Sequence, residues 1–362
     1  MGVLVFLTVL SVLIIVHEFG HLVVARMLGV RVEKFSLGFG PRLISYTRNF
    51  TQYSLSLIPL GGYVKLCGDT REEFKGNDWE YLAKPPGERA AIVFAGPLLN
   101  YFLALVVFYF VFLTGYPALG TRVGELLEGF PAQKAGLAKN DLIIAVDSLR
   151  VKEWDEMQEI IRSRKAGNIE VRLLRDGQEK TFLIEPRVER LKNIFGQEER
   201  VRIIGIVPKE EFVILKYNLG DSFFAASQKL WWITYATFKA LWRMLTGGMS
   251  AKDSMTGPLG IFFITTHAWS LGINYLLQVV ALLSASLGIF NVLPFPVLDG
   301  GHLMFLGLEK IRRRPLATKA EEWISRAGFG FIIVIAIFVF YSDLARFGII
   351  DKLIGLAGKI SF

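Results

Sequence analysis

Residues 3–25 read VLVFLTVLSVLIIVHEFGHLVVA, an apolar run long enough to cross a membrane as one helix. The run lacks both a basic leading region and a small-residue cleavage site, so it is predicted to be a retained span and not a signal peptide. His17, Glu18 and His21 lie in its second half. Polar groups at that depth are costly unless they serve an interior site, and two of the four histidines fall in this one turn.

The composition extends this interpretation to the whole chain of 362 residues. Apolar residues make up 52% of it and charged residues 20%, and the mean hydropathy is +0.42. Four stretches contain no Asp, Glu, Lys or Arg: 1–17, 91–121, 254–298 and 327–342. Residues 122–253 carry charges at the density of a soluble protein. The contrast predicts about four membrane spans and one soluble module of about 100 residues.

Two classes of site are excluded by the same counts. The single cysteine, Cys67, cannot form an internal disulfide or a cysteine-cluster metal site. The net charge of +8 does not indicate nucleic acid as a partner, because no basic block is interleaved with aromatic residues. Positive loops are instead the usual means by which a membrane protein sets its orientation.

Hydropathy places the remaining spans near residues 90–116, 271–308 and 327–348. The first half of the uncharged stretch 254–298 is expected to lie at the membrane interface or to dip into it. Residues 222–245 are rich in aromatics, but their polar residues fall on one stripe at 100° per residue. We therefore expect a helix lying on the outer membrane surface, the alternative being a soluble amphipathic helix packed on the neighbouring domain.

The basic residues beside the spans predict the orientation. Residues 26–90 hold ten Lys and Arg, and a second basic cluster precedes the last span between Lys310 and Arg326. Both loops are expected on the cytoplasmic side. The amino terminus and residues 115–256 are then expected outside, with the histidine turn toward the cytoplasmic side.

A metal site is predicted from the spacing of the two histidines. His17 and His21 stand at i and i+4, on one face of a helix, where both imidazoles can bind one zinc ion, and Glu18 beside them can act as a general base. Zinc then needs a third protein ligand. Asp299 is the sole carboxylate between residues 254 and 308, in a segment whose prolines and glycines break the helix. His302 is the competing candidate for this position.

Further motifs follow the first in order along nearly the whole chain. They are GFGP at 38–41, PLGGYVK at 59–65, AGPLLN at 95–100, GPLGI at 257–261 and NVLPFPVLDGG at 291–301. Together with HEFGH at 17–21, this series resembles the site-2 protease family of intramembrane zinc metalloproteases. The similarity is greatest to the bacterial regulator-of-sigma-E protease group.

The resemblance implies one zinc ion per chain, held by His17, His21 and Asp299, with Glu18 as the catalytic general base. It also implies that Asn291, Pro294 and Pro296 position the substrate. Residues 54–65 are implied to form part of a membrane-associated β-hairpin that pairs with an unwound substrate. An ordinary cytoplasmic hairpin is the alternative for that stretch.

The soluble module is similar to a PDZ domain over residues 116–188, with one copy where enterobacterial relatives carry two. Asn140 and Ser148 stand where that family usually has glycine, although asparagine tolerates a left-handed backbone. A PDZ groove binds a peptide by strand addition or acts as a size filter above the active site. The sequence leaves both roles open.

We therefore expect a polytopic α-helical membrane protein with one inserted extracytoplasmic α+β domain. The expected division is 1–115 for two spans and the β region, 116–190 for the PDZ domain, 191–256 for a linker and the interfacial helix, and 257–362 for two spans. The expected activity is hydrolysis of peptide bonds in single-pass transmembrane proteins within the lipid bilayer, such as anti-sigma factors or remnant signal peptides. A membrane-tethered PDZ adaptor and a metal or proton transporter are the alternatives.

Overall fold

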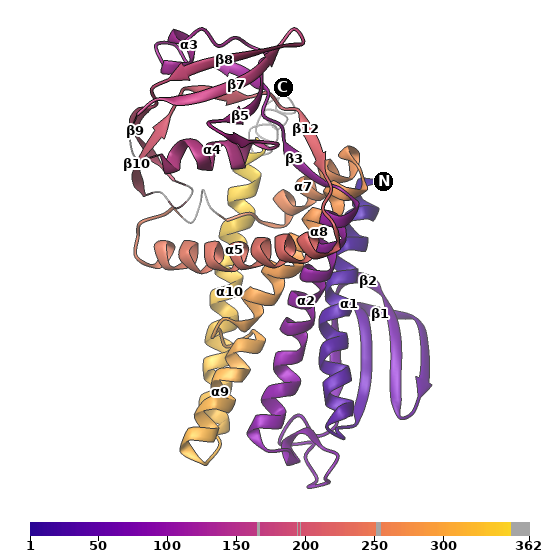
Figure 1. Ribbon diagram of the computed structural model, residues 1–362. Helices are drawn as coiled ribbons and strands as arrows, with labels where there is room; N and C mark the ends of the chain where they lie inside the picture. The colour runs from indigo at the N-terminus through magenta and orange to yellow at the C-terminus, as the bar shows by residue number, and fades with distance from the viewer. Residues whose placement is uncertain (165–166, 194, 196, 251–254, 349–362) are drawn as a thin grey trace, which may run out of the picture. The chain divides into compact units, whose positions relative to one another are not determined.

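The computed structural model describes residues 1–164, 167–193, 195, 197–250 and 255–348 (Figure 1). Within them, four helices are long and apolar enough to cross a membrane. These are α1 (Gly2–Met27), α2 (Pro86–Thr114), α8 (Ile273–Val292) and α10 (Thr318–Arg346). The prediction of a four-span membrane protein is confirmed. Residues 349–362, the end of the last expected division, lie outside the described residues.

The chain forms two compact units. We call residues 1–111, 222–237 and 251–362 the membrane unit, and residues 112–221 and 238–250 the strand-rich unit. In the membrane unit, α1, α2 and α8 pack at glycines. A Cβ on Gly20 would lie 2.3 Å from the Ala95 carbonyl oxygen, and a Cβ on Gly288 would lie 2.8 Å from the Pro97 carbonyl oxygen. Such small residues allow helix backbones to approach closely in a membrane.

The third span differs from the sequence-based expectation of one run over 271–308. α8 ends at Val292, and a non-helical segment of six residues precedes α9 (Asp299–Arg312). The physical reason is that Pro294 and Pro296 lack backbone N–H groups and their rings obstruct helix continuation. Before α8, the shorter helix α7 (Pro258–Leu271) contains too few residues to cross a bilayer.

A buried carboxylate attaches α7 to the last span. Asp343 of α10 is 1% exposed and accepts hydrogen bonds from the backbone amides of Gly257 (3.2 Å) and Gly260 (2.9 Å). These amides belong to the first turn of α7, where helices lack intrahelical acceptors. The stretch 327–342 was recognised as uncharged in the sequence, but the role of the residue immediately after it was not foreseen.

The β region is larger than the expected hairpin. Strands β1 (Val32–Arg48) and β2 (Thr51–Leu66) curl so that four segments form one sheet, in the order 42–48, 51–56, 34–37 and 62–66. The segment 34–37 thus pairs on both sides, with residues 52–55 and with residues 62–65. Gly61 has φ +137°, and a Cβ there would lie 2.1 Å from the Phe39 ring, so this turn requires glycine. The 3-10 turn η1 (Tyr81–Ala83) then leads to α2.

The strand-rich unit has its own apolar core. Its main sheet has the order β6-β5-β7-β8, with β5 at Leu142–Val146, β6 at Leu149–Arg150, β7 at Ile169–Arg175 and β8 at Gln178–Ile184. Two helices accompany this sheet, α3 (Pro131–Lys134) and α4 (Trp154–Ser163). Met157 and Ile161 of α4 are buried against Ile143, Val171 and Leu173 of the sheet. The core residues of one face therefore alternate along the strands and recur at helical spacing on α4.

Residues beyond the expected PDZ range complete this unit. They form β9 (Arg187–Lys192), β10 (Glu198–Ile203), β11 (Ile206–Pro208) and β12 (Phe212–Leu215). β9 and β10 pair with each other. β11 pairs with β4 (Val123–Leu126) and β12 pairs with β3 (Tyr116–Leu119), so the end of the segment returns to its beginning. This return was not expected from the sequence.

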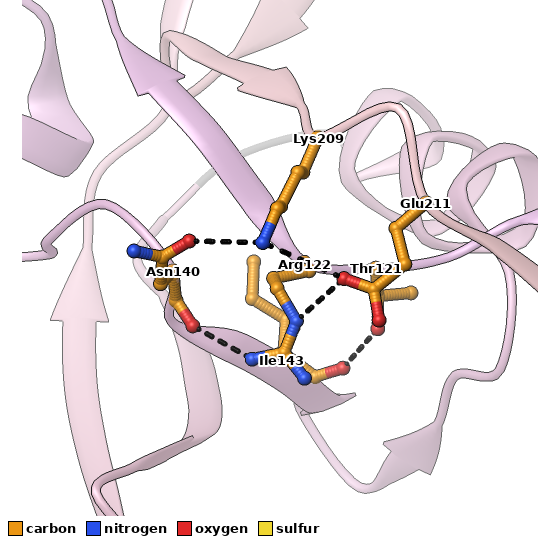
Figure 2. Close-up of polar contacts among 6 residues, drawn as sticks. All are labelled: Thr121, Arg122, Asn140, Ile143, Lys209 and Glu211. Atoms are coloured by element: carbon orange, nitrogen blue, oxygen red, sulfur yellow. Dashed lines mark hydrogen bonds and ion pairs between the residues drawn. The ribbon is translucent and has the colours of Figure 1, made fainter.

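Figure 2 shows the polar contacts that fasten this return. Arg122 donates to Glu211 (2.9 Å) and to the Asn140 carbonyl oxygen (3.0 Å), and Lys209 donates to the Asn140 side chain (3.3 Å). Asn140 has φ +70°, the left-handed conformation that asparagine tolerates. In the next turn, Asp147 takes the positive φ (+52°) and not Ser148, whose position had been compared with a family glycine.

Helix α5 (Leu219–Leu245) occupies the aromatic stretch whose role the sequence left between membrane surface and domain packing. It is not among the four candidate spans of the described residues, as expected. Ser222, Ala226, Leu230 and Ile233 form its buried face, and the Thr234 hydroxyl lies 2.8 Å from the Tyr101 hydroxyl of α2. Trp231, Trp232 and Trp242 are exposed, which is typical of a helix at a membrane interface.

The Asp141–Arg175 ion pair generates a prediction for the stability of the strand-rich unit. Asp141 is 1% exposed and accepts two hydrogen bonds of 2.7 Å from Arg175 and one of 2.8 Å from the Ala138 amide. Burial raises the pKa of Asp141. The hydrogen bonds lower the pKa by more than burial raises it, so the net pKa lies below the usual 3.8. The pair therefore stabilises the fold above pH 3.8, and this contribution is lost as the pH falls through the lowered pKa.

We expect Asp141→Asn to lower the free energy of unfolding of this unit by about 3 kcal/mol at pH 7, because Arg175 loses its charged partner. Hydrogen exchange of the β5 and β7 amides in the full chain measures the effect. The matched control is Asp176→Asn, the same change at an exposed neighbour. A destabilisation that stays equally large at pH 3 would contradict the assignment.

Candidate metal centre

The histidine pair lies on one face of α1, in the carboxyl-terminal half of the helix. The Nε2 atoms of His17 and His21 are 3.3 Å apart, and the ring centroids are 4.9 Å apart. His17 is 8% exposed, so its imidazole is largely withdrawn from solvent. The i, i+4 spacing on a continuous helix is sufficient to bring both nitrogens to one point.

Asp299 reaches the same point from the break in the third span. It is the first residue of α9, and its Oδ2 lies 3.0 Å from His17 Nε2 and 3.7 Å from His21 Nε2. Gly300 and Gly301 allow this approach, since a Cβ on either would lie about 2 Å from a carbonyl oxygen of the preceding segment, at 2.1 Å from Leu293 and 2.2 Å from Phe295. The helix break therefore aims the carboxylate at the histidines.

The three side chains fit a zinc ion. One ligand atom from each of His17, His21 and Asp299 lies within 4.8 Å of the others. His21 Nδ1 is 2.9 Å from the Ile92 carbonyl oxygen, which can only accept, so Nδ1 carries the proton and Nε2 is free to ligate. Asp299 Oδ2 is buried without a hydrogen-bond partner in the described part of the chain. A cation at this point would satisfy that oxygen.

Glu18 lies between the histidine turn and the β sheet. Its carboxylate accepts a hydrogen bond from the Val64 backbone amide of β2. A Cβ on Gly62 would lie 3.3 Å from Glu18 Cγ and 3.1 Å from Ile14 Cγ2, so the strand passes close over α1. His17, Glu18, His21 and Asp299 together line a cavity of about 830 Å³. The arrangement places a carboxylate and three ligand atoms around one space large enough for a peptide segment.

The remaining residues singled out in the sequence have different positions. His302 lines the cavity, but its side chain is exposed and is not part of the described three-residue metal group. Asn291 lies in the last turn of α8. Pro294 and Pro296 lie in the break before α9, where Pro296 packs against Gly328 of α10. None of these three is among the residues that line the cavity.

Several further residues that line the cavity are polar or charged. Arg89 forms an ion pair with Glu309, and both line the cavity with Asp69. Burial raises the pKa of Asp69, and the neighbouring Glu73 raises it further. The loop after β2 is held by Glu80, which accepts hydrogen bonds from the backbone amides of residues 75–77. The cavity lining therefore includes polar groups from the loop after β2 as well as the two histidines.

Two residues of α2 touch the histidines directly, and sequence reasoning did not assign either a role. A Cβ on Gly96 would lie 2.3 Å from His21 Nε2 and 3.0 Å from His17 Cε1. Asn100 Nδ2 lies 3.2 Å from His17 Nδ1. Both belong to the AGPLLN motif, which the sequence analysis used only as part of the resemblance. A polar asparagine inside an apolar span is the signal that could have singled out Asn100.

Comparison with known proteins is consistent with this geometry. The model of peptidase family M50 matches residues 5–335. A candidate zinc metalloprotease of Mesorhizobium japonicum is 36% identical over 357 residues, covering 94% of this chain and 97% of the relative. Similar relatives occur in Campylobacter jejuni (34% identical, 93% and 92% covered) and in Clostridium acetobutylicum (32% identical, 92% and 94% covered).

The contact at Gly96 generates a prediction for the metal centre. We expect Gly96→Ala to weaken zinc binding by about 10–100-fold, because the added methyl group displaces the His21 ring from the ligand position. Chelator competition on the purified protein measures the zinc affinity. Gly87→Ala is the control in the same helix, since a Cβ there meets no atom within 4 Å. Equal zinc affinity in the two variants would contradict the prediction.

Proposed function

The chain belongs to peptidase family M50, and from this membership we propose that it hydrolyses peptide bonds within or beside the transmembrane segments of single-pass membrane proteins. The observation that carries the proposal is the convergence of His17 and His21, from the candidate span α1, with Asp299, from the start of α9, next to Glu18. It is a multi-pass membrane protein and a zinc metalloprotease of this family. Anti-sigma factors and remnant signal peptides are the substrate classes proposed.

The residues of the metal centre are proposed to have separate roles in peptide hydrolysis. His17, His21 and Asp299 would hold zinc, which supplies a Lewis acid that makes water more acidic and polarises a carbonyl group. Glu18 is the general base, whose carboxylate accepts the proton of the attacking water and passes it to the leaving amine. The Val64 amide orients that carboxylate, since a hydrogen bond to one oxygen leaves the other available.

The β sheet and the helix break are proposed to present the substrate. A peptide bond in a helix has its carbonyl occupied, so the substrate must be extended at the cleavage site, and a sheet edge binds extended chains. Residues 62–66 form an edge segment beside α1. Asn291, Pro294 and Pro296 are proposed to hold the substrate on the opposite side, at the break that aims Asp299.

The strand-rich unit is proposed to act as a PDZ domain. Its support is the order of α3, β5, α4, β7 and β8 around one core, and the pairing of β11 with β4, which leaves the other edge of β11 unpaired within the described sheet. Such an edge accepts a peptide by strand addition. A size filter that excludes large substrates is the second role consistent with the same fold.

The proposed orientation places the amino terminus and the strand-rich unit outside a bacterial cytoplasmic membrane. The basic loop of residues 26–90 supports a cytoplasmic position for the β sheet and the loop held by Glu80. The exposed tryptophans of α5 support its contact with the outer leaflet. The metal centre then lies toward the cytoplasmic side.

We expect Glu18→Gln to lower the cleavage rate of a single-span substrate by about 10²–10⁴-fold while the protein keeps its zinc. Glutamine has a similar size but cannot accept the proton from water. Cleavage in detergent and bound zinc are measured on the same preparations of wild type and variant. A variant that cleaves like wild type would contradict the general-base role of Glu18. Absence of both cleavage and zinc in wild type would favour a membrane-tethered adaptor, and ion transport without cleavage would favour a transporter.

Cysteine accessibility tests the orientation. In a Cys67→Ser background, Ser148→Cys is expected to react with a membrane-impermeant maleimide in intact cells, because residue 148 lies in the strand-rich unit. Thr70→Cys is expected to react only after the cells are permeabilised. Both residues are exposed, so access through the protein is matched. The reverse labelling pattern would invert the topology.

A further inference from the structure

Asn100 of α2 is fully buried beside the metal centre. Its side chain is 0% exposed, and Nδ2 lies 3.2 Å from Nδ1 of His17. Its other amide atom, Oδ1, is buried and has no hydrogen-bond partner in the described residues. An orphaned acceptor inside a membrane protein is costly, so the orientation of this amide has consequences.

The amide orientation decides which nitrogen of His17 carries the ring proton. With Nδ2 toward the ring, the amide donates to Nδ1, and neutral His17 must carry its proton on Nε2. That proton would then occupy the space between His17, His21 and Asp299. A rotation of 180° exchanges the two ends of the amide, so that Oδ1 accepts a proton from Nδ1 and the Nε2 lone pair faces the site.

Asp299 supplies an independent reason to favour the second orientation when a metal is bound. Its Oδ2 lies 3.0 Å from His17 Nε2, yet it forms no hydrogen bond with any described group. The contact therefore does not have the geometry of an Nε2–H donor facing a carboxylate. A cation between the two atoms would satisfy the carboxylate, and it requires the lone pair of Nε2.

We propose that Asn100 is a positioning residue for the metal, which accepts the Nδ1 proton of His17 through its side-chain oxygen and so fixes Nε2 as the zinc ligand. In the same way, Nδ1 of His21 lies 2.9 Å from the Ile92 carbonyl oxygen, which accepts its proton. The two histidines would then each donate their outer N–H to a carbonyl oxygen, one from the backbone and one from a side chain. This inference rests on the zinc site of the proposed function.

A separate contact in the same place involves the Asn100 backbone and not its side chain. The Ser284 hydroxyl of α8 donates a hydrogen bond of 2.7 Å to the Asn100 carbonyl oxygen. Ser284 is 0% exposed, so this contact is also withdrawn from water. It fixes α2 against α8 without involving the Asn100 amide, and therefore provides a means to separate helix packing from the contact with His17.

Three variants of the full chain in detergent test the inference, with zinc affinity measured by chelator competition. Asn100→Leu removes the acceptor at similar volume and is expected to weaken zinc binding by about 10–100-fold. Asn100→Asp supplies only acceptors and is expected to bind zinc at least as tightly as wild type. Ser284→Ala is expected to leave the affinity unchanged, because the His17 contact is preserved.

Asn100→Asp decides the matter even if Asn100→Leu fails to fold. If the aspartate variant loses zinc affinity, an acceptor opposite Nδ1 does not support ligation through Nε2, and the inference is overturned. Equal affinity of wild type and Asn100→Leu would overturn it as well. If wild type binds no zinc, the proposed metal centre fails and the inference fails with it, whereas an effect confined to Asn100 leaves the proposed function intact.

Discussion

His17 and Asp299 bring polar atoms from two helices of the membrane unit to one point, where the Asp299 Oδ2 atom is buried. Their Nε2 and Oδ2 atoms lie 3.0 Å apart, yet Oδ2 forms no hydrogen bond with any described group. A buried pair left in this state is unfavourable in an apolar surrounding, and a divalent cation resolves it. The Asp299 carboxylate reaches the imidazoles only because the helix breaks at residues 293–298 and because residues 300 and 301 are glycines.

The parts that could be predicted from the sequence are those where a local pattern carries the information. Uncharged stretches of sufficient length predicted the four spans, because the bilayer imposes one length and one composition on every crossing. The HEFGH turn predicted a histidine pair, because i, i+4 spacing fixes a common face on any helix. Asp299 could be singled out because a lone carboxylate in an apolar stretch needs a partner, and the structure places it beside His17.

The parts that could not be predicted depend on partners distant in the sequence. Gly96 is constrained by two histidine rings on another helix, and Asp343 by two backbone amides more than eighty residues away. The prolines predict a break in the third span, but hydropathy alone continues to residue 308 and does not indicate that α8 ends at Val292. The sheet formed by residues 32–66 has segments that pair on both sides, and alternation along one strand does not indicate which segment is its neighbour.

Glu18 connects the metal centre to the sheet, and this connection constrains where a substrate can lie. The Val64 amide that donates to Glu18 belongs to the edge segment 62–66, so this backbone donor is already engaged by the carboxylate of the proposed general base. A Cβ on Gly62 would lie only 3.3 Å from Glu18 Cγ, so glycine at this position leaves room for the Glu18 side chain. An extended peptide bound along this sheet would therefore pass the same carboxylate that must accept a proton from water. Positioning of the base and presentation of the peptide thus depend on one strand, and a shift of that strand would disturb both.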